Sequence, residues 1–316
     1  MVCKKISRKN IGKEKIYMEK NQPERSARNL QGEHDIQSMR NLIHSLPHGS
    51  SLVDFEEVIQ MHSVQDATRL WFTNGKLIAF AYVDDFNNLC FDLLPDNSSI
   101  ELESEIVGWG MQLLRERNQS TGEESTLDAS CTGSNIDRIQ LLERHGFIQQ
   151  AIRSLHFERD LSLPIPSIIL PAGYTIRPVK GESEVEDLVT LHRLAFGTDH
   201  MTVEYRLAMM HAPTYEPCFD WLAQSPSGKL AAFCIGSFEE GDPSIAYLDP
   251  VGTHPDHRRL GLAAALMIHG MSVFLDRGVK LLKFGTSSEN IGMQKLGEFL
   301  GFSLKSESVW FSKQVE

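Results

Sequence analysis

Apolar and polar positions along the chain change from a strand-like to a helix-like period in the same order in both halves. In each half, two segments with strand-like alternation flank a turn signal, Asn-Gly at residues 74–75 and Ser-Gly at residues 227–228, which predicts a β-hairpin. A longer segment with helical spacing follows each hairpin, at residues 100–118 and 262–277.

Both halves also end in the same way. Residues 134–147 read SNIDRIQLLERHGF and residues 289–302 read ENIGMQKLGEFLGF, so an asparagine precedes Gly-Phe at one common offset. Each copy predicts an Asn-capped helix, a glycine that ends it, and a closing strand at residues 154–160 or 308–314. Repeated spacing of this kind indicates two copies of one structural unit.

The segment between the two copies is punctuated by prolines and lacks helix signals, which is typical of a linker. We therefore predict a basic, disordered tail at residues 1–28, a first domain at residues 29–162, a linker at residues 163–172 and a second domain at residues 173–316. The length of 316 residues agrees with two domains. Met18 is an alternative start of the chain.

Charge is distributed unevenly. Of the 31 Lys/Arg and 42 Asp/Glu, nine basic and three acidic residues lie in residues 1–28, so the rest of the chain is strongly acidic. An acidic body repels phosphate backbones and attracts cations, which argues against a nucleic-acid partner and favours an amine substrate. The three acids of the tail argue against a transit peptide.

The longest apolar stretch, residues 262–268, is far shorter than the roughly 20 residues that cross a membrane, so we predict a cytoplasmic protein without a membrane partner. The five cysteines are scattered and lack C-x-x-C spacing, which predicts reduced thiols and no metal site. The sequence does not fix the oligomeric state.

Residues 245–267, IAYLDPVGTHPDHRRLGLAAALM, contain the strongest chemical signal. They predict a strand, a proline turn and a helix that opens at Gly261. A strand that feeds a helix in this way presents unpaired N–H groups and the positive end of the helix dipole, which bind anions. Gly261 and Ala263 let a pyrophosphate approach the main chain, and Arg258 and Arg259 add positive charge.

The R-x-x-G-x-A pattern formed by Arg258, Gly261 and Ala263 resembles motif A of the GNAT superfamily of N-acetyltransferases. The SSEN segment at residues 287–290 and the LGF at residues 300–302 extend the resemblance over most of the second half. The first half repeats the layout without the signature, since PDNSSIE stands at the corresponding place. The chain therefore resembles a tandem GNAT protein with one live site and one degenerate copy.

This resemblance implies an α/β fold of two tandem GNAT-like domains. Each is a mixed, mostly antiparallel twisted sheet flanked by helices, and the second has a splayed pair of central strands. It also implies acetyl-CoA as the cosubstrate, with pantetheine on the main chain of Val251 and Thr253 and pyrophosphate on the N–H groups of residues 259–264. The implied cofactor-binding residues are Val251, Gly252, Thr253, Arg258, Arg259, Leu260, Gly261, Leu262, Ala263, Ala264 and Asn290. Asn290 either bonds pantetheine or only caps its helix.

Acetyl transfer by direct attack on a thioester requires a base for the amine and a proton for the leaving thiolate. Asp249 is the leading candidate base, because it lies two residues before Val251 and on the same pleat face as Tyr247. The alternative is that Asp249 only orders the turn before its proline. Glu239 and Glu240 are further candidates.

The proton donor departs from the family pattern, because Gly297 occupies the place where many members have a tyrosine. Tyr247, Ser287, Ser288 or water would have to replace that tyrosine. The neighbouring His254 and His257 are assigned to the turn and not to catalysis.

The acceptor is expected to be a small, cationic molecule with a primary amine. The sequence fixes neither its identity nor the length of the acyl chain that the donor carries. Residues of the early helices that would line its site are His192, Asp199, His200 and Glu204. Two rival hypotheses remain open at this point: a non-catalytic CoA-binding sensor or scaffold, and a protein that binds partners through its basic tail.

Overall fold

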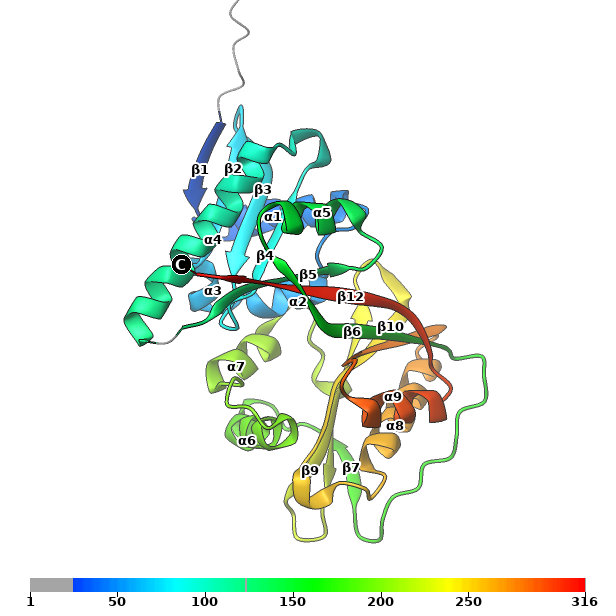
Figure 1. Cartoon of the computed structure of the whole chain (residues 1–316). Helices are drawn as coiled ribbons and strands as arrows, with labels where there is room; N and C mark the ends of the chain where they lie inside the picture. The colour runs from blue at the N-terminus through cyan, green and yellow to red at the C-terminus, as the bar shows by residue number, and fades with distance from the viewer. Residues whose placement is uncertain (1–24, 123, 316) are drawn as a thin grey trace, which may run out of the picture.

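The computed structural model describes residues 25–122 and 124–315 (Figure 1). Most of the predicted basic tail, with Met18, lies outside these residues. Residues 25–28 do not belong to a tail, because β1 (Arg25–Asn29) pairs antiparallel with β2 (Thr68–Thr73). Ala27 on this strand packs against the core, and Arg28 pairs with Asp35 and stacks on Phe72. The basic residues of β1 therefore bind within the domain.

The two halves repeat one order of elements. The N-terminal half contains β1, α1 (Glu33–Ser45), α2 (Leu52–Val58), α3 (His62–Asp66), β2, β3 (Lys76–Val83), β4 (Leu89–Leu93), α4 (Ile100–Thr121), β5 (Thr126–Thr132), α5 (Ile136–Arg144) and β6 (Ile148–Asp160). The C-terminal half contains β7 (Thr175–Pro178), α6 (Val185–Phe196), α7 (Val203–His211), β8 (Asp220–Gln224), β9 (Leu230–Glu239), β10 (Asp242–Thr253), α8 (Leu262–Asp276), β11 (Leu281–Ser287), α9 (Ile291–Phe299) and β12 (Ser303–Gln314).

Both predicted hairpins are confirmed. Asn74 and Gly75 have φ of 51° and 78°, which matches the twist of the β2–β3 hairpin, and Gly228 has φ of 85° between β8 and β9. The long helices and the Asn-capped helices also lie where predicted. The closing strands β6 and β12 begin several residues earlier than the sequence pattern indicated.

The strands form a four-stranded sheet, β1-β2-β3-β4, and an eight-stranded sheet, β5-β12-β6-β11-β10-β9-β8-β7. The larger sheet crosses between the halves, because β12 inserts between β5 and β6, and β6 also pairs with β11 (Figure 1). Each half therefore lends a strand to the other. Residues 163–172, where we predicted a linker, contain neither helix nor strand.

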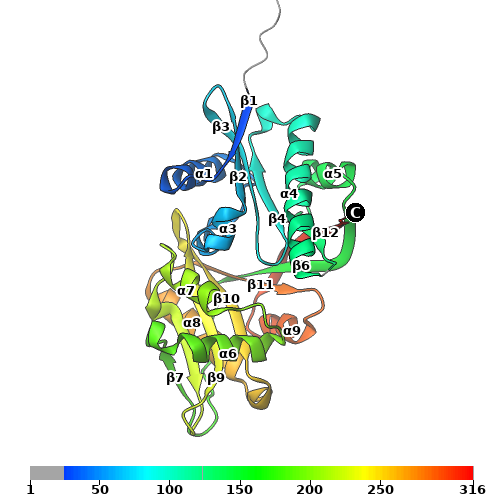
Figure 2. The ribbon, with the colours of Figure 1, turned by 90° about the vertical axis from the view of Figure 1, so that its left-hand side faces the viewer.

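Helices cover both faces of β8 and β9 in the C-terminal half (Figure 2). The helix α8 packs on one face, in a core with Trp221, Cys234 and Leu248. The helices α6 and α7 pack on the other face, where Leu222 and Phe233 point. Within residues 25–122 and 124–315, no helix is long and apolar enough to span a bilayer.

Candidate active site

Two central strands of the C-terminal half part from each other, as predicted. Among the described residues, β10 and β11 pair in parallel over residues 245–247 and 281–283, although both strands continue for several residues. The register of β10 against β9 shifts between Leu248 and Val251, where three steps on β10 oppose two on β9. Such a bulge bends its strand, so β10 turns away from β11 and a gap opens between them.

Main-chain groups of β10 face this gap. The N–H of His254 donates to the carbonyl of Ala231 on β9 at 2.9 Å. Since successive residues of an antiparallel strand direct their peptide groups to opposite sides, those of Val251 and Thr253 point away from β9 and toward the gap. Gly252 has a packing role, because a Cβ there would overlap the ring of Phe233.

The start of α8 is open to an anion. Gly261 is its N-cap at φ 77°, no described side chain caps the helix, and its first main-chain hydrogen bond runs from Ala265 to Gly261 at 2.9 Å. The N–H groups of residues 262–264 precede that bond and are therefore left for a ligand. No described atom lies within 4 Å of a Cβ built on Gly261. Negative charge is favoured at such a helix end.

Arg258 has a different position from the one that we expected. Its guanidinium donates to the carbonyl of Ala195 at 2.9 Å and to that of Thr253 at 3.4 Å. Arg258 thus braces the turn against the end of α6, while Arg259 and Leu260 are exposed. Among the residues of the R-x-x-G-x-A pattern, Gly261 keeps the anion site open, and Arg258 supports the turn.

The corresponding turn of the N-terminal half is closed to anions. The hydroxyl of Ser99 caps α4 by accepting from the N–H of Leu102 at 3.2 Å. Glu101 and Glu103 add negative charge to the first turn of that helix. An anionic ligand would meet both an occupied helix end and like charge there.

The gap between β4 and β5 is filled by Arg138 from α5. An isolated bridge links Asn88, the residue before β4, with Asp128 on β5. The guanidinium of Arg138 lies 3.7 Å from the centroid of the Phe91 ring and donates to the carbonyl of Phe91 at 2.8 Å. It is also 3.6 Å from the buried carboxylate of Asp92. Met293 occupies the same offset after the capping asparagine in the C-terminal half.

Asp249 stands where β10 and β11 begin to part. Its carboxylate accepts a hydrogen bond from the N–H of Gly285 on β11 at 3.0 Å, so it bridges the closed end of the gap. The side chain of Asp249 is accessible to solvent, although many protein atoms lie around it. Burial raises the pKa of Asp249 to about 7, against the Gly285 hydrogen bond, and Asp54 raises it further.

Tyr247 belongs to a cluster beside Asp249. Its hydroxyl donates to the carboxylate of Glu239, and the ammonium of Lys283 lies 3.2 Å from that carboxylate and 3.4 Å from the hydroxyl. Burial and Glu239 raise the pKa of Tyr247 above its usual range, so the phenol stays protonated. Glu239 is therefore paired, and Glu240 lies 3.5 Å from His44 of the N-terminal half.

The other proposed proton donors make structural hydrogen bonds. Ser287 accepts from the N–H of Glu289 at 3.1 Å, and Ser288 accepts from the N–H of Arg153 at 3.0 Å. A Cβ at Gly297 would overlap the ring of Phe284, so the tyrosine found elsewhere in the family has no room at this position.

Three polar residues of the signature region hold local structure. The side chain of Asn290 caps α9 by accepting from Met293 at 3.1 Å. His254 accepts from the N–H of Asp256 at 3.1 Å. His257 is hydrogen-bonded to Tyr174 at 2.8 Å.

The four candidate acceptor residues do not form one cluster. His192 stacks on Phe233 with ring centroids 5.4 Å apart, and burial, with Arg206, lowers its pKa to about 4. His200 packs on Phe86 of the N-terminal half at 5.1 Å. Glu204 lies 4.0 Å from a histidine of that half, and Asp199 is exposed.

Two carboxylates near Asp249 were missed by the sequence analysis. Asp54 and Glu57 lie on α2 of the other half, so no local pattern related them to the site. Burial, with Glu239, raises the pKa of Asp54, and burial, with Asp54 and Asp249, raises that of Glu57 to about 8. Helix α2 therefore adds negative charge near the gap.

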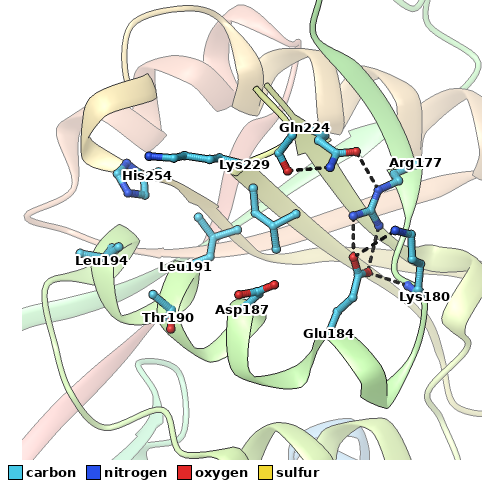
Figure 3. A pocket seen from close by; sticks show the side chains of 12 residues that line it. Arg177, Lys180, Glu184, Asp187, Thr190, Leu191, Leu194, Gln224, Lys229 and His254 are labelled. Atoms are coloured by element: carbon cyan, nitrogen blue, oxygen red, sulfur yellow. Dashed lines mark hydrogen bonds and ion pairs between the residues drawn. The ribbon is translucent and has the colours of Figure 1, made fainter. Parts of the chain in front are cut away.

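A separate cavity of about 500 Å³ runs along α6 (Figure 3). It lies between α6 and the β8–β9 turn and does not include Asp249 or Tyr247. Its polar lining is partly paired internally, since Arg177 and Glu184 form two hydrogen bonds of 2.9 and 2.6 Å. We place the chemistry at the gap, because the unsatisfied main-chain groups lie there.

The strand gap, the open helix end and the carboxylate of Asp249 together suit an extended, anionic ligand that lies beside a candidate base. Residues 185–302 match the Acetyltransferase (GNAT) family. GNAT proteins use acetyl-CoA.

Curated relatives match about half of the chain. A mycothiol acetyltransferase of Salinispora arenicola is 30% identical over 162 residues, which cover 49% of this chain and 53% of that protein. The mycothiol acetyltransferase of Thermobispora bispora is 27% identical over 178 residues, covering 53% and 60%. The chain thus spans about half the length of the curated relatives that it matches.

Solved structures are similar over nearly the whole chain. A GCN5-related N-acetyltransferase from Sphaerobacter thermophilus has a TM-score of 0.66 at 19% identity, with 92% of this chain and 96% of that chain covered. A tandem GNAT protein from the clavulanic acid biosynthesis pathway has a TM-score of 0.66 at 15% identity, with 93% and 99% covered. These likenesses establish the tandem GNAT fold.

Proposed function

We propose that the C-terminal half transfers an acetyl group from acetyl-CoA to a primary amine of a small cationic molecule by direct attack on the thioester. The main support is that a strand gap with free main-chain groups, an uncapped helix start and Asp249 occur together at one place. The pantetheine arm would lie along Val251 and Thr253. The pyrophosphate would bind the N–H groups of residues 262–264.

The N-terminal half serves as a structural partner in this proposal. In this half the start of α4 is capped by Ser99 and its acidic first turn repels an anion. The side chain of Arg138 fills the space that corresponds to the strand gap of the C-terminal half. The chain is expected to bind one acetyl-CoA. The relatives' shared name, mycothiol acetyltransferase, supports acetyl transfer and leaves the acceptor of this chain to be determined.

Asp249 acts as the base in the proposed reaction. A carboxylate with a pKa of about 7 accepts the proton that an ammonium must lose before its nitrogen can attack the carbonyl carbon. The nitrogen forms the new amide bond, and the carbon–sulfur bond breaks. The proton on the leaving thiolate comes from Tyr247 or from water; the raised pKa of this phenol makes it a weak acid, so its contribution is small.

The charge around Asp249 supports a cationic acceptor. Burial raises the pKa values of Asp54, Glu57 and Asp249, and neighbouring carboxylates add to this effect: Glu239 acts on Asp54, and Asp54 acts on both Glu57 and Asp249. A positive ligand relieves the repulsion among these carboxylates, whereas a neutral or anionic one does not.

The test is thiol release from acetyl-CoA across a panel of amines, with wild type beside an Arg258→Ala/Gly261→Glu variant. Gly122→Glu is a matched control, because Gly122 at the end of α4 in the N-terminal half also combines a positive φ, 73°, with open space around a built Cβ. Turnover on one class of amine that is lost in the double variant and kept in the control supports the proposal. Saturable CoA binding without turnover on any amine would favour a non-catalytic sensor.

A further inference from the structure

We propose that the acceptor lies across the polar face of the strands exchanged between the halves, and that His156 and Ser308 bind its distal part. This inference rests on the proposed function and extends it to a class of acceptor: a polyhydroxylated amine with several rings, such as an aminoglycoside. The evidence is the alternation of side chains on β10, β11, β6 and β12, together with the hydrogen bonds that link them.

One face of these strands is apolar and buried. Leu248, Phe284 and Phe157 point to this side and belong to the core around α8. The other face is polar and, apart from the exposed Asp249, half-buried. Its residues in strand order are Tyr247 and Asp249 on β10, Lys283 on β11, Glu158, His156 and Ser154 on β6, and Ser308 on β12.

The sheet face is polar on the strands that α6 and α7 do not cover. On β8 and β9 the same side of the sheet is apolar, with Leu222, Phe233 and Ile235 packed against α6 and α7. Apolar residues there match a covered sheet, and polar residues on the next strands match a surface that contacts water or a polar ligand. Asp249 lies on the same side as this polar surface, so an amine that it deprotonates must approach from there.

A row of direct neighbours leads from Asp249 across the exchanged strands. The N–H of Gly285 donates to Asp249, Gly285 is the register partner of His156, and His156 lies 2.9 Å from the hydroxyl of Ser308. Neighbouring strands are about 4.8 Å apart, so this row reaches roughly 10 to 15 Å from the base. An acceptor that uses the whole row must be longer than a single sugar ring.

A second hydrogen-bonded pair, Trp310 and Ser154, lies beside the pair of His156 and Ser308. The indole N–H of Trp310 donates to the hydroxyl of Ser154 at 2.9 Å, and Trp310 is half-buried. Burial and Lys283 lower the pKa of His156, so its imidazole is neutral. Its Nε2 is hydrogen-bonded to Ser308, which leaves Nδ1 to meet a ligand as a donor or an acceptor. Uncharged hydrogen-bonding groups next to an aromatic ring suit hydroxyl groups on a ring with an apolar face. A polymethylene amine would make no use of them.

The proposal gives the N-terminal half a direct role in specificity. His156 and Ser154 belong to β6, the last strand of that half, and reach the site because β6 pairs with β11. Ser308 and Trp310 come from β12, which would lie far from β6 without the strand exchange.

The experiment compares kanamycin, glucosamine and spermidine as acceptors for the full-length wild type and for His156→Phe and Ser308→Ala. Steady-state thiol release gives KM for each amine and for acetyl-CoA. Ser130→Ala on β5 is the matched control, since Ser130 is exposed and opposite Trp310 but beyond the row. Binding is followed separately by tryptophan fluorescence, with Trp310→Phe to identify the signal. Thermal unfolding checks that each variant is folded.

The inference predicts that His156→Phe and Ser308→Ala raise KM for kanamycin roughly tenfold, the loss of about one hydrogen bond, and leave KM for glucosamine and acetyl-CoA unchanged. Equal KM values for kanamycin in all variants, preference for spermidine, or absence of kanamycin binding would overturn it. Kanamycin binding that His156→Phe and Ser308→Ala weaken, without acetyl transfer to any of the three amines, would support a binding site along this row and count against the proposed function.

Discussion

Replacing Asp249 by asparagine tests the proposed base most closely. The amide keeps the size of the side chain and still accepts from the N–H of Gly285, so the closed end of the gap should be preserved. Only the ability to take up a proton is lost. Removal of a positioned general base costs about a hundredfold or more in kcat/KM.

The pH profile gives the magnitude in wild type. With a pKa of about 7, Asp249 is about 9% ionised at pH 6 and about 91% at pH 8, so kcat/KM should rise about tenfold over this range from Asp249 alone. Deprotonation of the amine also increases the rate with pH. The difference in slope between wild type and Asp249→Asn therefore isolates the carboxylate.

Asp249→Asn should raise the stability of the fold although it lowers activity. The pKa of Asp249 in the folded state, about 7, lies above the usual value of about 4 for an aspartate, so the folded state binds the proton more tightly. The carboxyl therefore destabilises the fold increasingly as pH rises from about 4 to about 7, and the cost levels off above 7. Asp249→Asn should unfold at a higher temperature than wild type at pH 8, and the difference should shrink by pH 5. A variant that retains wild-type kcat/KM and its pH slope would refute the role of Asp249.

Three further predictions concern the cofactor sites. Gly261→Glu places a carboxylate at the open end of α8 and should raise KM for acetyl-CoA about a hundredfold, measured by thiol release, with kcat for saturating cofactor less affected. Arg138→Met should lower the free energy of unfolding by about 3 kcal/mol, because Asp92 loses its buried partner. Calorimetric titration should still give one bound acetyl-CoA per chain. Unchanged stability or two bound ligands would contradict this. Gly297→Tyr should destabilise the fold by about 3 kcal/mol in denaturant unfolding, because the new side chain overlaps Phe284, and a faster enzyme with unchanged stability would be the contrary result.

The repeated elements were predictable from the sequence because their signals are local. The Asn-Gly turn, the asparagine caps and the glycine that opens α8 each act within a few residues, and the structure shows them in place. The parting of β10 from β11 was predictable from the family pattern, and it is confirmed by their short pairing.

The strand exchange was not predictable in this way. β6 and β12 follow equivalent helices and have similar patterns, so the sequence does not say which copy of the sheet each one joins. That choice depends on contacts between distant segments, such as Ser308 with Ser154. The strand β1 was missed because four of its five residues, RSARN, are charged or polar, and its pairing with β2 overrides that composition.

The site was predictable only in its local part. Gly261 and Asp249 could be found within one segment, whereas Asp54 and Arg138 act across the fold on residues far away in the sequence. Arg258 matches the family signature, yet its side chain holds the turn to α6. A motif identifies the residue type that a position requires, and the surrounding structure decides which atoms of that residue are used.

The most direct test of the account is mass spectrometry of the amine after incubation with isotope-labelled acetyl-CoA, with wild type and Gly261→Glu side by side. We predict labelled acetyl on a primary amine of a cationic acceptor with wild type, and little or none with the variant. Equal labelling by both proteins, or no labelled amine although wild type binds acetyl-CoA, would contradict the claim that this gap in the C-terminal half is an acetyltransferase site.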